Sequence, residues 1–167
     1  MAIQLITLDE VVSNAFRNQL NDLTTLPLTF LEIAQENHIR PVLGDNFYDI
    51  IVAEHDAGVF TGLNQTLVED FIVPSLAFFV KYEILHDITM DLNSVGLLKN
   101  DTEFGESQGD DTRQEFSAKT LQHAYTLLRK MVRFIEKEQK DNDKFPDYDN
   151  TKNISNFVSK RAGIVIG

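Results

Sequence analysis

The pair of residues closest to a known metal-binding pattern is Glu83 and His86, which are three positions apart. On a helix these positions face the same side, and a Glu-x-x-His pair supplies two ligands of the di-iron centre in some helical bundles. Such a centre needs a second Glu-x-x-His pair and two further glutamates. No glutamate stands three residues before His38, His55 or His123. We therefore interpret the pair as a chance match on a helix and predict no metal site.

Two short acidic segments, 141–143 and 147–149, resemble calcium loops only in part. An EF-hand loop requires a glycine at its sixth position and a glutamate at its twelfth, because the turn is tight and the last ligand is bidentate. Counted from Asp141, these positions hold Pro146 and Lys152. The segments are therefore interpreted as solvated acidic turns.

Nucleophilic and phosphate-binding patterns are absent from the sequence. No serine lies in a Gly-x-Ser-x-Gly frame, and neither a Gly-x-x-x-x-Gly-Lys-Ser/Thr loop nor a Gly-x-Gly-x-x-Gly loop occurs. The chain has no cysteine, which excludes disulfides, thiolate zinc sites and cysteine nucleophiles. We predict that the protein is not an enzyme and needs no cofactor.

Charge is distributed unevenly along the 167 residues. Residues 1–111 hold four bases and nineteen acids, about −15, whereas residues 112–167 hold eleven bases and seven acids, +4, which together give the net −11. Phosphate binding needs clustered Lys and Arg, so most of this chain would repel DNA. The bases of residues 119–140 are interleaved with Glu136 and Glu138, which favours a solvated helix face over DNA binding. The polarity suits either head-to-tail packing of copies or simple solubility.

The elements that must position these residues are helices. Thr7 and Glu10 form a capping box, and Gly44 suits a left-handed position after a helix, with Asp45 or Asn46 as the next cap. Pro41 and Pro74 predict kinks or stops. We therefore predict an all-α fold, an irregular bundle of four or five helices. The predicted helices cover about 8–20, 28–43, 45–57, 64–92 and 112–140.

Two segments fall outside this helical pattern. Residues 93–111 are rich in acids, asparagine and glycine, and predict a long loop or small hairpin. Residues 141–167 predict an extended C-terminal tail beyond a domain of residues 1–140. Its apolar end, 164–166, could add as a strand to a neighbouring chain or could be a frayed terminus. No apolar run approaches the roughly 18 residues that span a bilayer, so no membrane partner is expected.

One segment, residues 34–51, resembles a known family. It is similar to the I-x-P-x-L-G-x-x-F/L-Y-D segment of small helical head-to-tail connector (adaptor, or head-completion) proteins of tailed bacteriophages, and looks most like those of phages with Bacteroidetes hosts. The order of an apolar central helix, an acidic loop, a long helix and an extended tail is also similar. The residues that carry the resemblance are Pro41, Leu43, Gly44, Phe47 and Tyr48.

This resemblance implies a structural virion protein made in the cytoplasm of the bacterial host. Its copies would form a ring, commonly a dodecamer, below the portal in the neck, bridging capsid and tail. The loop 93–111 would face the DNA channel, which DNA crosses without sequence-specific binding, and the tail would bind the portal protein, a neighbour or further neck or tail proteins. The channel-lining residues would be Asp101, Glu103, Glu106, Asp110 and Asp111. The docking residues would be Phe157, Val158, Ile164, Val165 and Ile166.

A function from another class remains open. The chain could be a cellular helical adaptor or regulatory protein that binds one partner protein through its long C-terminal helix. The proximity of portal and capsid genes to its own gene would separate the two hypotheses.

Overall fold

The computed structural model describes residues 3–16, 27–94 and 110–149, and describes the side chains of 3–16, 27–85 and 114–149. Its elements are α-helices and short segments of wider π-helix, labelled η. In chain order they are α1 (Leu8–Val11), η1 (Val12–Phe16), α2 (Thr29–Ala34), η3 (Gln35–Ile39), α3 (Arg40–Leu43), α4 (Asp45–Ala57), α5 (Asn64–Leu67), η4 (Val68–Ile72), α6 (Val73–Ser94) and α7 (Asp110–Asn142). The structure confirms the predicted all-α fold over the residues that it describes.

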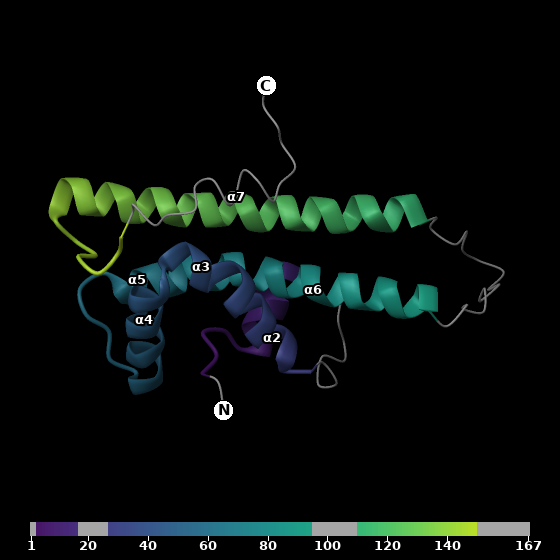
Figure 1. Cartoon of the computed structure of the whole chain (residues 1–167), viewed down its shortest axis with the longest axis horizontal. Coiled ribbons are helices and arrows are strands. Elements are labelled where there is room, and N and C mark those ends of the chain that lie inside the picture. The colour runs from purple at the N-terminus through teal and green to yellow at the C-terminus, as the bar shows by residue number, and fades with distance from the viewer. Residues whose placement is uncertain (1–2, 17–26, 95–109, 150–167) are drawn as a thin grey trace, which may run out of the picture.

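The two longest helices, α6 and α7, lie side by side and form the axis of the molecule (Figure 1). Helix α7 lies on one side of α6, and the shorter helices α2 and α4 lie on the other side. The buried side of α7 carries Ala124, Leu128, Met131 and Ile135, spaced by three or four residues as one face of a helix requires. Helix α6, at the centre, is apolar over most of its circumference because it packs against neighbours on both sides.

The two prolines follow the wide helical turns in the same way. Pro41 is the second residue after η3, and Pro74 is the second residue after η4. A proline has no backbone N–H to donate to the carbonyl four residues earlier, and its ring crowds that carbonyl. A π-helical turn at that point widens the helix and accommodates the ring. The helical path continues through both prolines, each preceded by a wide turn, so neither proline stops its helix, and a kink at each stays a prediction.

The capping box at the start of α1 is confirmed. The Glu10 backbone N–H donates to Thr7 Oγ1 at 3.3 Å, and the Thr7 backbone N–H donates to Glu10 Oε2 at 2.8 Å. The predicted end of α4 is confirmed as well, because Gly58 is left-handed, with φ 65° and ψ 21°.

The start of α4 differs from the prediction. Gly44 has a positive φ of 78°, as expected, but its ψ of 152° lies outside the left-handed helical region. Neither Asp45 nor Asn46 caps α4, because the helix already begins at Asp45 and Gly44 occupies the cap position. The Asp45 carboxylate instead lies 2.7 Å from Arg40 Nε. The cap prediction was wrong because Arg40, held close by the α3–α4 corner, competes for that carboxylate.

Three helix ends differ from their predicted positions by two residues each. Helix α6 continues to Ser94 and α7 begins at Asp110, so both ends of the predicted loop 93–111 are helical. Helix α7 ends at Asn142, and Phe145 and Tyr148 beyond it are buried in the same core. The packed part of the chain therefore continues beyond the domain boundary predicted at residue 140. Within the described residues, no helix combines the length and apolarity needed to cross a membrane.

Candidate functional site

The corner between α3 and α4 is built from the residues that carried the family resemblance. Pro41 lies in the first turn of α3, and Leu43, Phe47 and Tyr48 are buried. Gly44 makes the turn between the two helices with its positive φ. These residues therefore set the angle at which α4 leaves α3 and anchor it to the core.

Gln35 joins this corner to the N-terminal segment. Its side chain is 3% exposed and makes three hydrogen bonds. Gln35 Nε2 donates to Tyr48 Oη at 2.6 Å and to the Ile3 carbonyl at 3.0 Å, while Oε1 accepts from the Leu5 N–H at 2.8 Å. Tyr48 Oη in turn donates to Glu36 Oε1 at 3.1 Å, and burial raises the pKa of Tyr48 to about 12. The tyrosine hydroxyl is therefore a neutral structural donor at physiological pH.

An exposed ionic cluster surrounds Arg40 on the outside of the same corner. The guanidinium lies 2.7 Å from Asp45, 3.3 Å from Glu36 and 3.5 Å from Asp49, and 5.0 Å above the Tyr48 ring. The hydrogen bond to Asp45 raises the pKa of Arg40 above its ordinary value. Three carboxylates share one cation, so the cluster is negative. Exposed pairs of this kind add little to stability, and their main effect is to fix where the carboxylates lie.

A polar contact inside the body links η3 to α6. His38 Nε2 and Glu83 Oε1 share a hydrogen bond at 2.9 Å. The His38 ring is stacked on Phe79, with centroids 4.0 Å apart and planes at 6°, and only 7% of the residue is exposed. Glu83 thus has a partner on a different helix from the one that the Glu-x-x-His pattern suggested. Among the described residues, no group of three or more His, Asp or Glu side chains could hold a metal ion.

A cavity of about 250 Å³ lies between α4, the turn at 61–64 and the segment 143–147. Phe47 and Ile50 line one wall, and Phe145 and Pro146 line the other. Phe145 is held by Gln139, whose amide donates to its carbonyl at 3.0 Å. Thr61, Asn64 and the charged residues Asp143, Lys144 and Asp147 complete the lining, so the walls are mixed in polarity.

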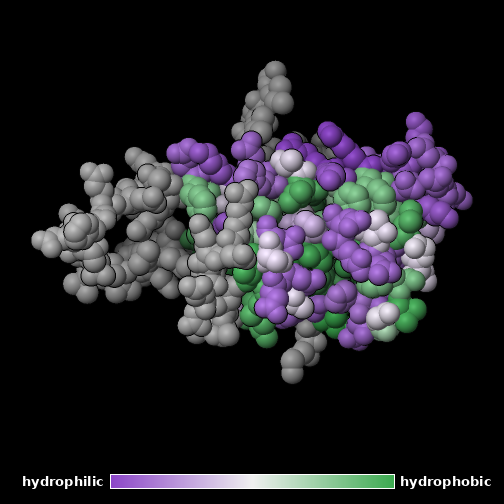
Figure 2. Space-filling view, turned by 180° about the vertical axis from the view of Figure 1, so that it is seen from behind, coloured by the Kyte–Doolittle hydropathy of each residue, from purple (hydrophilic) through white to green (hydrophobic). Residues whose placement is uncertain are grey.

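The outward side of α7 is basic. Lys119, Arg129, Arg133, Lys137 and Lys140 are exposed on it, turned away from the side that packs against α6. In Figure 2 hydrophilic residues line the edge that α7 forms and also extend over the face below it. Bases in the last turns of a helix also lie favourably in the field of its dipole. The exposed acids Glu115, Glu136 and Asp141 lie on the same side, so bases outnumber acids there, but the face carries both charges.

Most of the residues predicted for the channel and for docking lie outside the part of the chain that the structure describes. Asp101, Glu103 and Glu106 lie outside the described residues, as do Phe157, Val158, Ile164, Val165 and Ile166. Asp110 and Asp111 form the first turn of α7, where only the backbone is described.

The sequence analysis did not predict three polar contacts of this region, namely those of Gln35, His38 and Arg40. Gln35 and His38 are polar residues at positions that the periodicity of α2 and η3 places on the buried side, which was the available signal. The partners of Gln35 and His38 could not be identified in this way, because they are distant in the sequence.

Comparison with known proteins identifies one family. Residues 39–158 match the model of a family described as a family of unknown function, DUF6712. The match includes the α3–α4 corner, α6, α7 and the segment that carries Phe145 and Tyr148. No curated protein matches the chain. No solved structure matches it either.

Proposed function

The chain belongs to the DUF6712 family, whose function is unknown, and we propose that it is a subunit of a head-to-tail connector ring in a tailed bacteriophage. In this proposal the ring, with about a dozen copies as the family resemblance implies, lies below the portal in the neck of the virion. It bridges capsid and tail and surrounds the path of the DNA. The protein acts by assembly and catalyses no reaction.

The observation that carries the proposal is the position of the connector-like segment in the fold. The five residues of the resemblance, from Pro41 to Tyr48, form the α3–α4 corner, and three of them are buried. Residues at a buried helix corner determine how the helices are arranged, so their spacing is constrained by packing. The resemblance to connectors therefore involves residues that determine the architecture rather than an interchangeable surface sequence.

The shape of the helical body also supports a ring subunit. Helices α6 and α7 extend together beyond the shorter helices, and their ends at Ser94 and Asp110 lie at the same end of the molecule (Figure 1). The acidic residues proposed for the channel are in or next to the connection between these two ends. Acids that line a channel repel phosphate, so a duplex can slide through without being bound.

The alternative function, a cellular adaptor that binds one partner protein, is favoured by a single feature. The long helix α7 presents an exposed charged face along most of its length. An exposed helix of this kind suits binding to a single acidic partner. Under this alternative the protein would be a monomer or dimer and would not recognise a portal.

The test is mass photometry of the purified full chain, alone and mixed with the portal ring encoded in the same genome. A complex that adds many copies of the chain to each portal supports the connector function. If no complex forms with the portal or with another neck ring at any salt concentration, the connector function is wrong and the adaptor function gains weight. The position of the gene relative to portal and capsid genes provides an independent check.

A further inference from the structure

Helix α7 carries four exposed bases in a regular row. Arg129, Arg133, Lys137 and Lys140 are separated by four, four and three residues, so they follow one side of the helix. With a rise of about 1.5 Å per residue, the row is roughly 17 Å long. We call these four residues the basic row.

The basic row is not neutralised within the chain. None of its members forms an ion pair with another residue that the structure describes. Arg129 Nε donates to the Tyr125 carbonyl of its own helix, at 3.3 Å. Glu138 accepts from the Asn142 amide at 2.6 Å, on a different side of the helix from the row. The exposed Glu136 lies within the row, between Arg133 and Lys140, so four bases share this side with one acid. The basic row is therefore available to an acidic partner.

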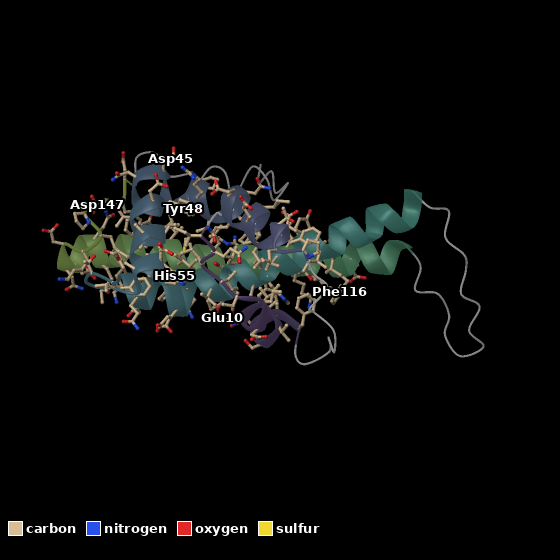
Figure 3. The ribbon with its side chains drawn as sticks, turned by 90° about the horizontal axis from the view of Figure 1, so that it is seen from below. Glu10, Asp45, Tyr48, His55, Phe116 and Asp147 are labelled. Carbon is tan, nitrogen blue, oxygen red and sulfur yellow. The ribbon has the colours of Figure 1, made fainter. Side chains whose placement is uncertain are left out.

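Helix α4 carries a row of acids with the same spacing. Asp45, Asp49 and Asp56 are exposed, and the exposed Ala53 occupies the remaining position of the series. The three acids are separated by four and seven residues, as Arg129, Arg133 and Lys140 are, so the row has the same length of roughly 17 Å. Asp45 and Asp49 share Arg40 with Glu36, and their side chains remain 82% and 66% exposed. We call these three aspartates the acidic row. Figure 3 places Asp45 at the outer edge of the molecule.

The two rows cannot meet within one molecule. The basic row points away from α6 on one side, and α4 lies on the other side of α6 (Figure 1). A contact between them therefore requires two copies, with the basic row of one copy facing the acidic row of the next. Such a contact uses two different surfaces of the same chain, so each copy keeps one free row for another neighbour. A contact of this heterologous type generates a closed ring when the rotation between copies closes.

We propose that the partner of the basic row is the acidic row of a second copy of this chain, and that this contact joins adjacent subunits. The proposal rests on the ring function proposed above and adds the surfaces through which the ring forms. The matched spacing aligns several opposite charges at once, and a network of this kind contributes more than isolated surface pairs. DNA is a poorer partner for the whole molecule, because the acids of α2 and α4 would repel phosphate.

The experiment reverses each row and then both rows. The basic-row variant is Arg133→Glu with Lys137→Glu, and the acidic-row variant is Asp49→Lys with Asp56→Lys. All four side chains are exposed, and circular dichroism verifies that each variant is folded. Portal-nucleated assembly and self-association without portal are both measured, by mass photometry and sedimentation, as salt is raised.

The proposal predicts that assembly is weakened in each variant and restored when the variants are combined, which a general change of charge would not produce. Each variant alone places like charges opposite one another, so assembly should need a roughly tenfold higher protein concentration. An equimolar mixture of the two variants should assemble like the wild type, because alternating copies restore opposite charges at every contact. The variant with all four substitutions should assemble by itself for the same reason. Wild-type association should weaken as salt increases, since the screening length falls from about 8 Å at physiological salt to about 3 Å at 1 M.

Matched controls change the net charge equally at other exposed positions. Lys119→Glu with Lys144→Glu is the control for the basic row, and Glu69→Lys with Asp70→Lys is the control for the acidic row. Both controls should assemble like the wild type. If they fail as strongly as the row variants, or if the mixture and the fourfold variant are not rescued, the proposed contact is wrong.

The remaining outcomes separate this contact from the proposed function. If both row variants form portal-bound rings as well as the wild type does, the proposed contact is wrong and the connector function is still supported. Salt-sensitive self-association that is rescued by mixing, without any portal binding, supports the contact and overturns the connector function. Absence of all association overturns both. If the basic-row variant loses affinity for a labelled DNA duplex while its rings form normally, the row binds nucleic acid and the contact is again overturned.

Discussion

Replacement of Gly44 by alanine tests whether the α3–α4 corner has the conformation described here. Gly44 has φ 78° and ψ 152°, a combination that is almost restricted to glycine. A Cβ atom at this position would meet nothing within 4 Å, so a steric clash contributes nothing. The whole effect of Gly44→Ala must therefore come from the backbone.

The expected magnitude follows from two opposing contributions. Backbone strain in this region costs about 1–3 kcal/mol, while the lower entropy of the unfolded alanine chain returns about 0.4–1 kcal/mol. The free energy of unfolding should fall by roughly 1–2 kcal/mol. The measurement is urea unfolding followed by circular dichroism, in which the midpoint should shift with no change in slope.

Gly58 provides the matched comparison. It also has a positive φ, 65°, but its ψ of 21° places it in the left-handed helical region that asparagine adopts readily. Gly58→Asn should therefore be close to the wild type, whereas Gly44→Asn should be as destabilised as Gly44→Ala. If Gly44→Ala unfolds at the wild-type urea concentration, or if Gly44→Asn is as stable as Gly58→Asn, the corner does not have this backbone conformation.

Four further substitutions test the packing of the helical body, with the free energy of unfolding from urea titration as the measurement. Gln35→Ala should cost about 2–4 kcal/mol, because it leaves the buried Leu5 N–H without an acceptor; a cost below about 0.5 kcal/mol would mean that residues 3–6 are not held by Gln35. Phe79→Ala should cost about 3–5 kcal/mol at its fully buried site, whereas Phe116→Ala, 49% exposed, should cost less than about 1 kcal/mol; equal costs would contradict the placement of α6. Burial raises the pKa of Tyr48 to about 12 in the folded protein, so the neutral hydroxyl stabilises the fold fully below about pH 10, and this stabilisation is lost as the pH rises through 12. The Tyr48→Phe variant should therefore lose less stability than the wild type over that pH range. An identical loss in both proteins would contradict burial of the hydroxyl.

Several features of the fold were predictable because their causes are local. The Thr7–Glu10 capping box joins residues three apart, and the left-handed end of α4 depends on Gly58 alone. The long helix α7 was recognised from the period of its apolar residues, and its bounds moved by only one turn or less. The connector function, the channel acids and the docking tail were also read from the sequence, and they remain predictions for the assembly experiment.

Other features depended on contacts between distant parts of the chain. Whether Asp45 would cap α4 or pair with Arg40 was decided by the geometry of the corner, since both roles suit an aspartate. Phe145 and Tyr148 follow a helix end in a polar stretch. They are buried because the Phe47 ring packs against both, and Phe134 packs against Phe145 as well. The apolar period of the tail was too short to predict that burial.

The sequence by itself determined most of the helices and the imbalance of charge between the two parts of the chain, because each depends on residues within a few positions of one another. The tertiary structure alone decided which distant groups meet: Gln35 with Leu5 across 30 positions, and His38 with Glu83 across 45. It also decided that the basic row and the acidic row lie on opposite sides of α6. The physical reason is that helix periodicity specifies which side of each helix is buried, whereas the partner of that side depends on how all the helices pack together.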